Sequence, residues 1–298
     1  MIIKVFIIEK FIRLFGGMLT FILIARYVNT EQLGIISVGA SIFAICQLFL
    51  QLESKPYLIG DINNNGDFKK LAAVFQISFI LSFSLIVMTI IFALFWDLHV
   101  VLQIALIGSA LVSTLSITKW INEGQEKFKT IIFIDIFTNL ISVTLKVFIV
   151  YFKLEWEFIA VIIIVDFMIN GLINLILIEA NYRRKLISHI CNFEIAIVKQ
   201  LIKDLLPLII AGGAVVLYSR LDMIMLASMC GTHCAGEYVL ALRFAELLII
   251  PTAMIVTFSA PKYLNPNTKY SQFQSKYIHI INFSSLLSLV SVFFILPV

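Results

Sequence analysis

Long apolar stretches recur along the whole chain and alternate with short polar connections. A helix needs about 20 residues to cross the hydrocarbon core of a bilayer. Nine stretches reach that length, near residues 5–27, 35–54, 71–95, 100–121, 131–152, 157–180, 204–229, 237–260 and 277–298. Backbone groups inside a bilayer must be hydrogen-bonded within the chain, which favours helices. The pattern therefore predicts an all-α fold, a polytopic transmembrane helical bundle.

Composition agrees with a membrane protein, because 61% of the residues are hydrophobic, 13% are charged and the mean hydropathy is +1.03. Loops rich in Lys and Arg stay in the cytoplasm. With a cytoplasmic N-terminus, the outer side holds only Arg26 and Lys153. The inner side holds 15 basic residues: Lys4, Lys55, Lys69, Lys70, Lys119, Lys127, Lys129, Arg183, Arg184, Lys185, Lys199, Lys203, Lys262, Lys269 and Lys276. This dispersed charge predicts orientation and argues against a nucleic-acid partner.

Charged side chains lie deep in the hairpin of residues 205–249. Each costs about 2.5–3.5 kcal/mol at a bilayer centre unless it is paired or faces water, so each is a functional candidate. Asp222 and Arg243 lie at equal depth on the two arms, close to the midplane. Arg220 and Asp222 face different ways, whereas Arg243 and Glu246 share a face. Asp222 with Arg243 is either a structural ion pair or part of an ion path, and Arg220 is predicted to contact a ligand.

Two polar stripes follow helical spacing in the first half: Asp135, Asn139, Ser142 and Lys146, and then Asp166, Asn170 and Asn174. Both stripes are predicted to face the protein interior. Lys146 and Asp166 lie at similar depth and can pair. The stripes fit either polar packing between helices or a path for a coupling ion. In the second interpretation the ion-coupling residues are Asp166, Asn170, Asp135 and Asp222.

Residues 181–203 form the longest inner connection. One face of its second part is apolar, which predicts an interfacial amphipathic helix. That face consists of Ile195, Val198, Ile202 and Leu205.

A weak internal repeat relates the two halves of the chain. Gly16-Gly17 and Thr30-x-x-x-Gly34 recur as Gly212-Gly213 and Thr232-x-x-x-Gly236, with a spacing that differs by six residues. Related repeats are a known transporter plan in which the substrate is handled between two lobes. The repeat thus predicts two pseudo-symmetric lobes.

Four cysteines, Cys46, Cys191, Cys230 and Cys234, do not form a framework. Only the last two are close in sequence and on the predicted outer side, where a disulfide can form. Together with His233 they make a weak metal-ligand set, so we predict no metal site.

Three runs in the second half carry a family resemblance: Leu206–Gly213 (LPLIIAGG), Tyr218–Leu226 (YSRLDMIML) and Gly236–Tyr238 (GEY). Ala25-Arg26-Tyr27 followed by Glu31-Gln32-Leu33-Gly34 carries it in the first half. These residues resemble bacterial polysaccharide flippases, the O-antigen translocases of the multidrug, oligosaccharidyl-lipid and polysaccharide exporter superfamily. Members carry two six-helix lobes. The resemblance therefore implies a first lobe at 1–180, a cytoplasmic linker at 181–203, and an incomplete second lobe at 204–298.

The resemblance also implies a function. It implies a transporter and not an enzyme, one that moves an undecaprenyl-diphosphate-linked oligosaccharide (an O-antigen, capsule or exopolysaccharide repeat unit) across the bacterial inner membrane by cation-coupled alternating access. The coupling ion is H+ or Na+, no cofactor is implied, and further partners are membrane lipids and a polysaccharide polymerase complex. An arginine guanidinium can bind two phosphate oxygens at once. The candidate substrate-binding cations are Arg13, Arg26, Lys146, Arg220 and Arg243.

Two alternatives remain open at this point. A multidrug exporter of the same fold would need acidic and aromatic groups in its cavity. A membrane-embedded polysaccharide polymerase or glycosyltransferase would need a long outer loop or an acidic metal motif, and the sequence shows neither feature.

Overall fold

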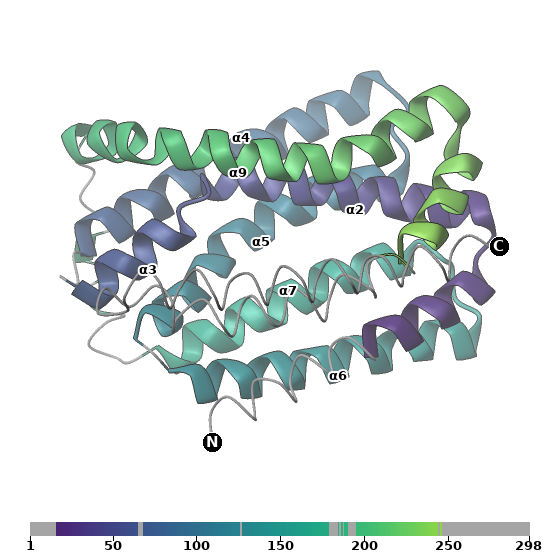
Figure 1. Ribbon diagram of the computed structural model, residues 1–298, viewed down its shortest axis with the longest axis horizontal. Helices are drawn as coiled ribbons and strands as arrows, with labels where there is room; N and C mark the ends of the chain where they lie inside the picture. The colour runs from purple at the N-terminus through teal and green to yellow at the C-terminus, as the bar shows by residue number, and fades with distance from the viewer. Residues whose placement is uncertain are drawn as a thin grey trace, which may run out of the picture. The chain divides into compact units, whose positions relative to one another are not determined.

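The computed structural model describes residues 16–64, 68–125, 127–178 and 195–243, together with residues 184, 186, 188, 189 and 245. Its helices are Gly16–Tyr27, α2 (Thr30–Gln51), α3 (Lys55–Asn64), α4 (Phe68–Phe95), α5 (Val100–Gly124), α6 (Phe128–Phe152), α7 (Phe158–Leu177) and α9 (Ile195–Cys230) (Figure 1). Residues 232–243 are also helical, and no strand occurs in these ranges. Six of the helices (α2, α4, α5, α6, α7 and α9) are long and apolar enough to cross a membrane. The predicted all-α polytopic bundle is confirmed.

Local side-chain bonds set where α2 begins and ends. Asn29 caps its N-terminus, because Asn29 Oδ1 accepts the Gln32 backbone N–H at 2.8 Å and Gln32 Oε1 accepts the Asn29 N–H at 3.1 Å. This reciprocal pair is a capping box. The helix ends where Leu52 and Glu53 adopt left-handed φ angles of 54° and 45°. The cap starts α2 earlier than the hydrophobic pattern alone predicted.

The helix α5 is the centre of the first part of the bundle, because it packs against α2, α3, α4, α6 and α7. Small and hydroxyl side chains make this close packing possible, as they commonly do between membrane helices. The Ser113 and Ser82 hydroxyls lie 2.7 Å apart between α5 and α4. Thr118 donates to the Gly171 carbonyl of α7 at 2.9 Å. By contrast, α4 exposes bulky apolar side chains such as Phe79, Phe83 and Phe95, the surface that lipid would cover.

The connections between helices gather at two ends of the bundle. At the predicted outer end, the Tyr27 hydroxyl donates to the Leu154 carbonyl, and the rings of His99 and Trp156 lie 5.7 Å apart. At the predicted inner end, Lys55 Nζ lies 2.9 Å from a Glu123 carboxylate oxygen. The connections that we predicted to share a side therefore do share an end. Which end faces the cytoplasm stays a prediction.

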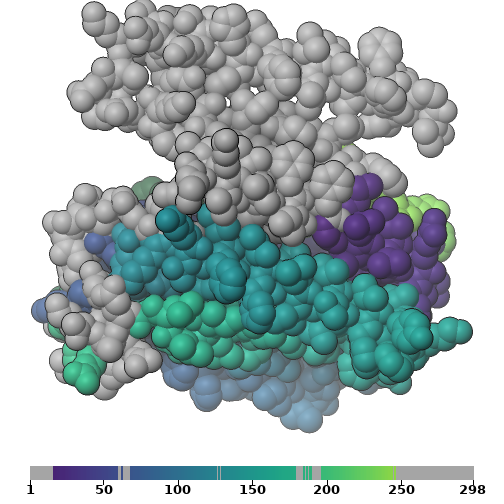
Figure 2. All heavy atoms as spheres, turned by 90° about the horizontal axis from the view of Figure 1, so that it is seen from below, coloured from purple at the N-terminus to yellow at the C-terminus, as the bar shows by residue number. Residues whose placement is uncertain are grey.

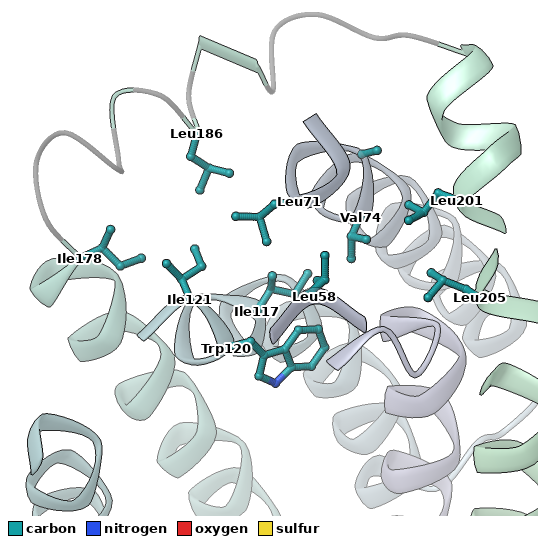
Figure 3. Close-up of a cluster of buried hydrophobic side chains, with 11 residues drawn as sticks. Leu58, Leu71, Val74, Ile117, Trp120, Ile121, Ile178, Leu186, Leu201 and Leu205 are labelled. Atoms are coloured by element: carbon teal, nitrogen blue, oxygen red, sulfur yellow. The ribbon is translucent and has the colours of Figure 1, made fainter. Parts of the chain in front are cut away.

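A hydrophobic cluster closes the predicted inner end (Figure 3). Its buried members come from α3, α4 and α5, the end of α7, residue 186 and the start of α9: Leu58, Leu71, Ala73, Val74, Ile117, Trp120, Ile121, Ile178, Leu186, Leu201 and Leu205. The first turns of α9 are thus held in a protein core.

This cluster shows what covers the predicted amphipathic face at the start of α9. The side of α9 that faces the protein carries Leu201 and Leu205, both buried, with Val198 packed against them, whereas Ile202 is 44% exposed. The side chain of Ile195 lies outside the described residues. The helix is also continuous over 36 residues, with Pro207 inside it, which is about 54 Å of helix. A sequence pattern shows an apolar face without showing whether lipid or protein covers it, and an interfacial position of this part of α9 stays a prediction.

The chain divides into two compact units, Met1–Gly236 and Glu237–Val298. The first unit holds every labelled helix up to and including α9. The division into lobes at 1–180 and 204–298 with a linker at 181–203 stays a prediction.

We predict that Gly171→Ala destabilises the bundle. A Cβ atom at Gly171 would lie 2.7 Å from Leu115 Cβ and 3.0 Å from the Leu115 carbonyl oxygen, so α7 would have to move away from α5. Overpacking of this kind typically costs about 1–3 kcal/mol. Thermal unfolding of the purified protein in detergent measures the loss. Gly17→Ala is the matched control, because a Cβ there meets nothing within 4 Å, and an equal loss in both variants would contradict the prediction.

Candidate functional site

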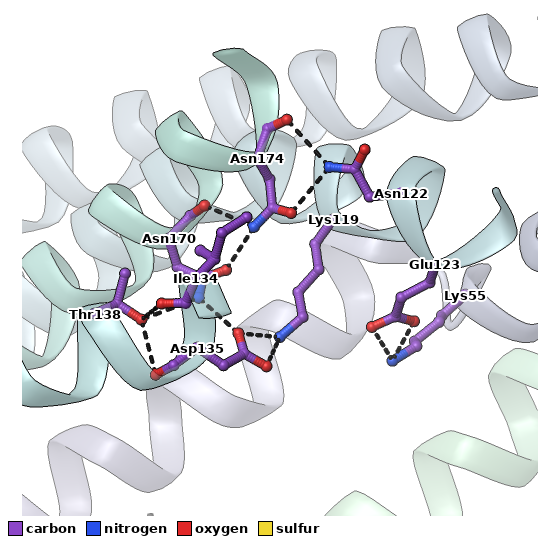
Figure 4. Close-up of polar contacts among 9 residues, drawn as sticks. All are labelled: Lys55, Lys119, Asn122, Glu123, Ile134, Asp135, Thr138, Asn170 and Asn174. Carbon is purple, nitrogen blue, oxygen red and sulfur yellow. Dashed lines mark hydrogen bonds and ion pairs between the residues drawn. The ribbon is translucent and has the colours of Figure 1, made fainter. Parts of the chain in front are cut away.

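A polar network joins α5, α6 and α7 inside the bundle (Figure 4). Its centre is the Asp135 carboxylate of α6, whose two oxygens lie 2.7 and 2.8 Å from Lys119 Nζ of α5. Asn170 of α7 donates through Nδ2 to Asp135 Oδ1 at 2.8 Å and to Thr138 Oγ1 at 3.2 Å. One ion pair and one amide thus connect three helices.

Two further amides extend the network toward the predicted inner end. Asn174 Nδ2 donates to Asn170 Oδ1 at 3.0 Å, and Asn122 Nδ2 donates to Asn174 Oδ1 at 3.0 Å. Asn122 and Asn174 are fully buried. Each amide donates toward the next, and the series ends on the Asp135 carboxylate. This direction of the dipoles stabilises the negative charge of Asp135.

Burial makes the Lys119–Asp135 ion pair important for the stability of the bundle. The Lys119 and Asp135 side chains are only 25% and 11% exposed, and both helices are candidate membrane spans. A charge in such a place needs a partner and additional hydrogen bonds to offset its lost hydration. Asp135 meets both needs, through Lys119 and through the Asn170 amide. Any event that changes the charge of Asp135 will also change how Lys119 is held.

Lys119 was counted above only as an inner-side cation and was missed as the partner of Asp135; it lies within α5, which continues to Gly124. The sequence did contain a signal: Lys119, Asn122 and Glu123 follow helical spacing, so the polar positions could have been assigned to a helix. Thr138 was missed as well. By contrast, the predicted stripe residues Asp135, Asn170 and Asn174 do meet.

The α6 stripe continues beyond Asp135. Asn139 Oδ1 and Ser142 Oγ are buried and have no hydrogen-bond partner in the part of the chain that the structure describes. The helix of residues 16–27 lies against this part of α6 (Figure 2), and a Cβ on Gly16 would be 3.3 Å from Asn139 Oδ1. The prediction that the stripe faces the interior is confirmed for Asp135, Asn139 and Ser142.

Lys146 and Asp166, the other predicted pair, are each partly buried on α6 and α7. Asp166 lies one helical turn before Asn170. Their pairing with each other, and the roles of Asp166, Asn170, Asp135 and Asp222 in ion coupling, stay predictions.

The remaining predicted cations are distributed over other elements. Arg26 is exposed at the end of the helix Gly16–Tyr27, and Arg220 is partly buried on α9. Arg243 belongs to the second compact unit, so its predicted pairing with Asp222 stays untested. Arg13 and Glu246 lie outside the described residues. On α9 itself, Asp222 Oδ1 accepts the Met223 backbone N–H at 2.7 Å.

A disulfide joins Cys230 to Cys234 across the turn that follows α9, with the two Cα atoms 5.8 Å apart. The sequence allowed this bridge, and the structure contains it. The turn is made by Gly231, whose φ of +94° favours glycine. Over the described ranges, no group of His, Cys, Asp and Glu side chains could hold a metal ion.

Comparison with protein families gives one match for this chain, a model described as "Polysaccharide biosynthesis protein", over residues 5–261. Comparison with curated proteins and with solved structures gives no match. The matched range includes the helices of the polar network and all of α9. Because the match covers most of a chain that also has the membrane-spanning helices expected of the family, this multi-pass membrane protein belongs to the polysaccharide biosynthesis family of polysaccharide and O-antigen flippases.

Proposed function

We propose that the protein translocates an undecaprenyl-diphosphate-linked oligosaccharide repeat unit across the bacterial inner membrane by alternating access, without chemical conversion of the substrate. The observation that carries the proposal is the family match over residues 5–261. The N-terminus is cytoplasmic in this proposal, and the loading side is the predicted inner end.

The substrate sets the chemistry that the protein must supply. A diphosphate carries negative charge that has to cross a low-dielectric region, so cations inside the membrane must receive it. Arg220 of α9 is our principal candidate, because a guanidinium can bind two phosphate oxygens at once. Its position inside a long apolar helix, ten residues before the helix ends at Cys230, and its partial burial support this role. Lys146, Arg26, Arg13 and Arg243 are the further candidates.

Ion coupling in this proposal acts through the network of α5, α6 and α7. Protonation of Asp135 would remove the negative charge that holds Lys119 at 2.7 Å. A bound Na+ would compete with Lys119 for the same oxygens. Either event would leave the Lys119 ammonium group without its carboxylate inside the bundle. An unpaired buried charge is unfavourable in free energy, so a different arrangement of the helices would be favoured. Asp166, Asn170 and Asp222 are additional candidates along the ion path.

The direct test is translocation by the purified chain in lipid vesicles. A fluorescent or radiolabelled undecaprenyl-diphosphate oligosaccharide is placed in one leaflet, and its arrival in the other leaflet is measured with an impermeant sugar-modifying enzyme. We expect protein-dependent translocation that responds to an imposed H+ or Na+ gradient. Translocation at the rate of protein-free vesicles under every gradient would contradict the proposed function.

We predict that Arg220→Ala abolishes translocation while membrane insertion stays normal. Arg220→Lys should restore only part of the activity, because an ammonium is a point charge without the planar fork. Abundance in the membrane and translocation rate are measured together. Lys199→Ala is the matched control, since Lys199 is an exposed cation of the same helix. Full activity of Arg220→Ala would remove Arg220 from the substrate path.

We predict that Asp135→Asn lowers the stability of the protein and changes its ion dependence. The substitution leaves the Lys119 ammonium without its carboxylate, and breaking a buried pair in this way typically costs about 3–5 kcal/mol. Asp135→Asn combined with Lys119→Gln should restore abundance but not gradient dependence. Thermal unfolding and translocation under imposed gradients provide the two measurements.

The matched control is the Lys55–Glu123 pair at the end of the bundle, where Lys55 is 48% exposed. An exposed pair contributes about 0–1 kcal/mol, so Lys55→Gln should have little effect. Retained gradient dependence in the Asp135 and Lys119 double variant would show that the network serves packing only.

A further inference from the structure

Two buried polar atoms continue the polar stripe of α6 from Asp135 toward the predicted outer end. Asn139 Oδ1 and Ser142 Oγ belong to residues one and two helical turns after Asp135, on the same face of the helix. Neither atom has a hydrogen-bond partner among the described residues, and Ser142 is only 3% exposed. Buried polar atoms in folded proteins almost always have a partner, which is protein or ordered water. These two atoms therefore point to a small polar ligand beside α6.

A glycine of the neighbouring helix leaves room for such a ligand. A Cβ on Gly16 would lie 3.3 Å from Asn139 Oδ1 and 3.6 Å from Val143 Cγ2. Since glycine has no Cβ, no side chain from this position fills the space beside the Asn139 oxygen. The nearby hydroxyl of Thr20 donates to the Gly16 and Gly17 carbonyls at 2.8 and 3.0 Å. Thr20 therefore does not supply the missing partner.

The chemistry of this place fits water better than a metal ion. Asn139 Oδ1 accepts a hydrogen bond, and the Ser142 hydroxyl can donate or accept one. A buried water makes about three hydrogen bonds, whereas hard cations such as Ca²⁺ and Mg²⁺ take about six oxygen ligands or more. The Asp135 oxygens already face the donors Lys119 Nζ and Asn170 Nδ2 (Figure 4). The described groups thus offer too few free oxygens to replace the hydration shell of a cation.

The spacing along α6 places such a water within reach of the Asp135 carboxylate. Residues four apart on a helix have Cβ atoms about 5–6 Å from each other. Two hydrogen bonds that share one oxygen span a similar distance, because each is about 2.8 Å long. A water bound to Asn139 can therefore bond to Asp135 on one side and lead to Ser142 on the other.

Buried atoms without a described partner also occur at the inner end of α5, where they are Asn122 Oδ1 and both amide atoms of Gln125. The amides of Asn174 and Asn170 separate these atoms from Asp135. A side-chain amide does not release its N–H protons near neutral pH, so this row of amides holds the carboxylate without passing protons to it. The direct approach to Asp135 is along α6.

We propose that Asn139 and Ser142 bind an ordered water through which Asp135 exchanges its proton with the predicted outer side. A proton from the outer side passes to this water, and the water gives one of its protons to a carboxylate oxygen of Asp135. Lys119 keeps its own proton. The net change is one proton gained by the carboxylate and one lost from the outer solution. This inference rests on the proposed function, in which an ion gradient drives translocation.

The fixed charge that Asp135 meets is that of Lys119. The titratable residues on the elements packed here are Lys129, Lys146 and Tyr151 on α6, Lys119 and Glu123 on α5, Asp166 on α7, and Arg26 and Tyr27 on the helix Gly16–Tyr27. Within this set, Lys119 contacts the Asp135 carboxylate. Protonation from the outer side therefore acts directly on the Lys119–Asp135 ion pair.

Carbodiimide labelling of the full chain tests the inference. Dicyclohexylcarbodiimide reacts with protonated carboxyl groups inside membrane proteins, and mass spectrometry of the peptides reports modification at Asp135 separately from other carboxyl groups. The protein is placed in sealed vesicles in one orientation, and the pH is lowered on one side only. We expect Asp135 to be labelled about tenfold faster after acidification of the outer side than after the same acidification of the inner side. Labelling that follows the inner pH instead would overturn the inference.

A double variant removes the two polar atoms of the water site. In Asn139→Leu with Ser142→Ala, outer-side labelling of Asp135 should slow about tenfold. The final extent of labelling at low pH on both sides should stay unchanged, which shows that the reagent still reaches Asp135. Gln125→Leu is the matched control, because its amide is also buried without a described partner but lies at the inner end. Its rate should stay within twofold of the native chain, and a native rate in the double variant would overturn the inference.

A second pair of variants covers the case in which the double variant does not fold. Gly16→Ala places a methyl group 3.3 Å from Asn139 Oδ1, whereas a Cβ on Gly17 meets nothing within 4 Å. Outer-side labelling should slow in Gly16→Ala and stay native in Gly17→Ala, and equal rates in the two would contradict the water site. Protection of Asp135 by outer Na⁺ in the native chain would show that a cation binds there instead of water.

The labelling measurements do not depend on translocation, so they separate the inference from the function on which it rests. Outer-side labelling as expected, without translocation by the native chain, supports the water site and contradicts the proposed function. Translocation together with labelling that follows the inner pH overturns the water site and supports the proposed function.

Discussion

Helices in a bilayer gain little from apolar contact with one another, because lipid tails are as apolar as leucine. What holds this bundle together is therefore close backbone approach and buried hydrogen bonding. Gly171 brings α7 onto α5, and Gly34 and Gly236 bring the start of α2 against the start of the helix that follows α9. At each of these positions the first carbon of a side chain would meet an atom of the neighbouring helix. The absence of that carbon allows the helices to lie as they do.

The same constraint gives the polar network its importance. Inside a bundle surrounded by lipid, a carboxylate persists only if the chain supplies its partners. Lys119, Asn170 and the amides behind Asn170 supply them for Asp135. A network of this kind connects three helices through one ion pair and a series of amide hydrogen bonds, where an apolar core would connect them through close packing alone.

The long helix α9 links this first-half core to the later part of the chain. Its first turns lie in the hydrophobic cluster of the predicted inner end, and its last turn leads through Gly231 into the crossing at Gly34. Arg220 and Asp222 therefore lie on a helix whose two ends are both in contact with the first-half helices.

Sequence by itself determined the fold class, the predicted membrane spans, and which connections share an end, because hydrophobic length and helical period are local properties. It also determined the polar stripe of Asp135, Asn139 and Ser142 and the two Thr-x-x-x-Gly motifs. Only the tertiary structure decided that Lys119 is the partner of Asp135, that the two motifs meet, and that Leu201 and Leu205 are covered by protein. Each of these depends on which helix lies beside which. The sequence of one helix determines which of its faces are apolar or polar. Which neighbour covers each face depends on how all the helices pack together.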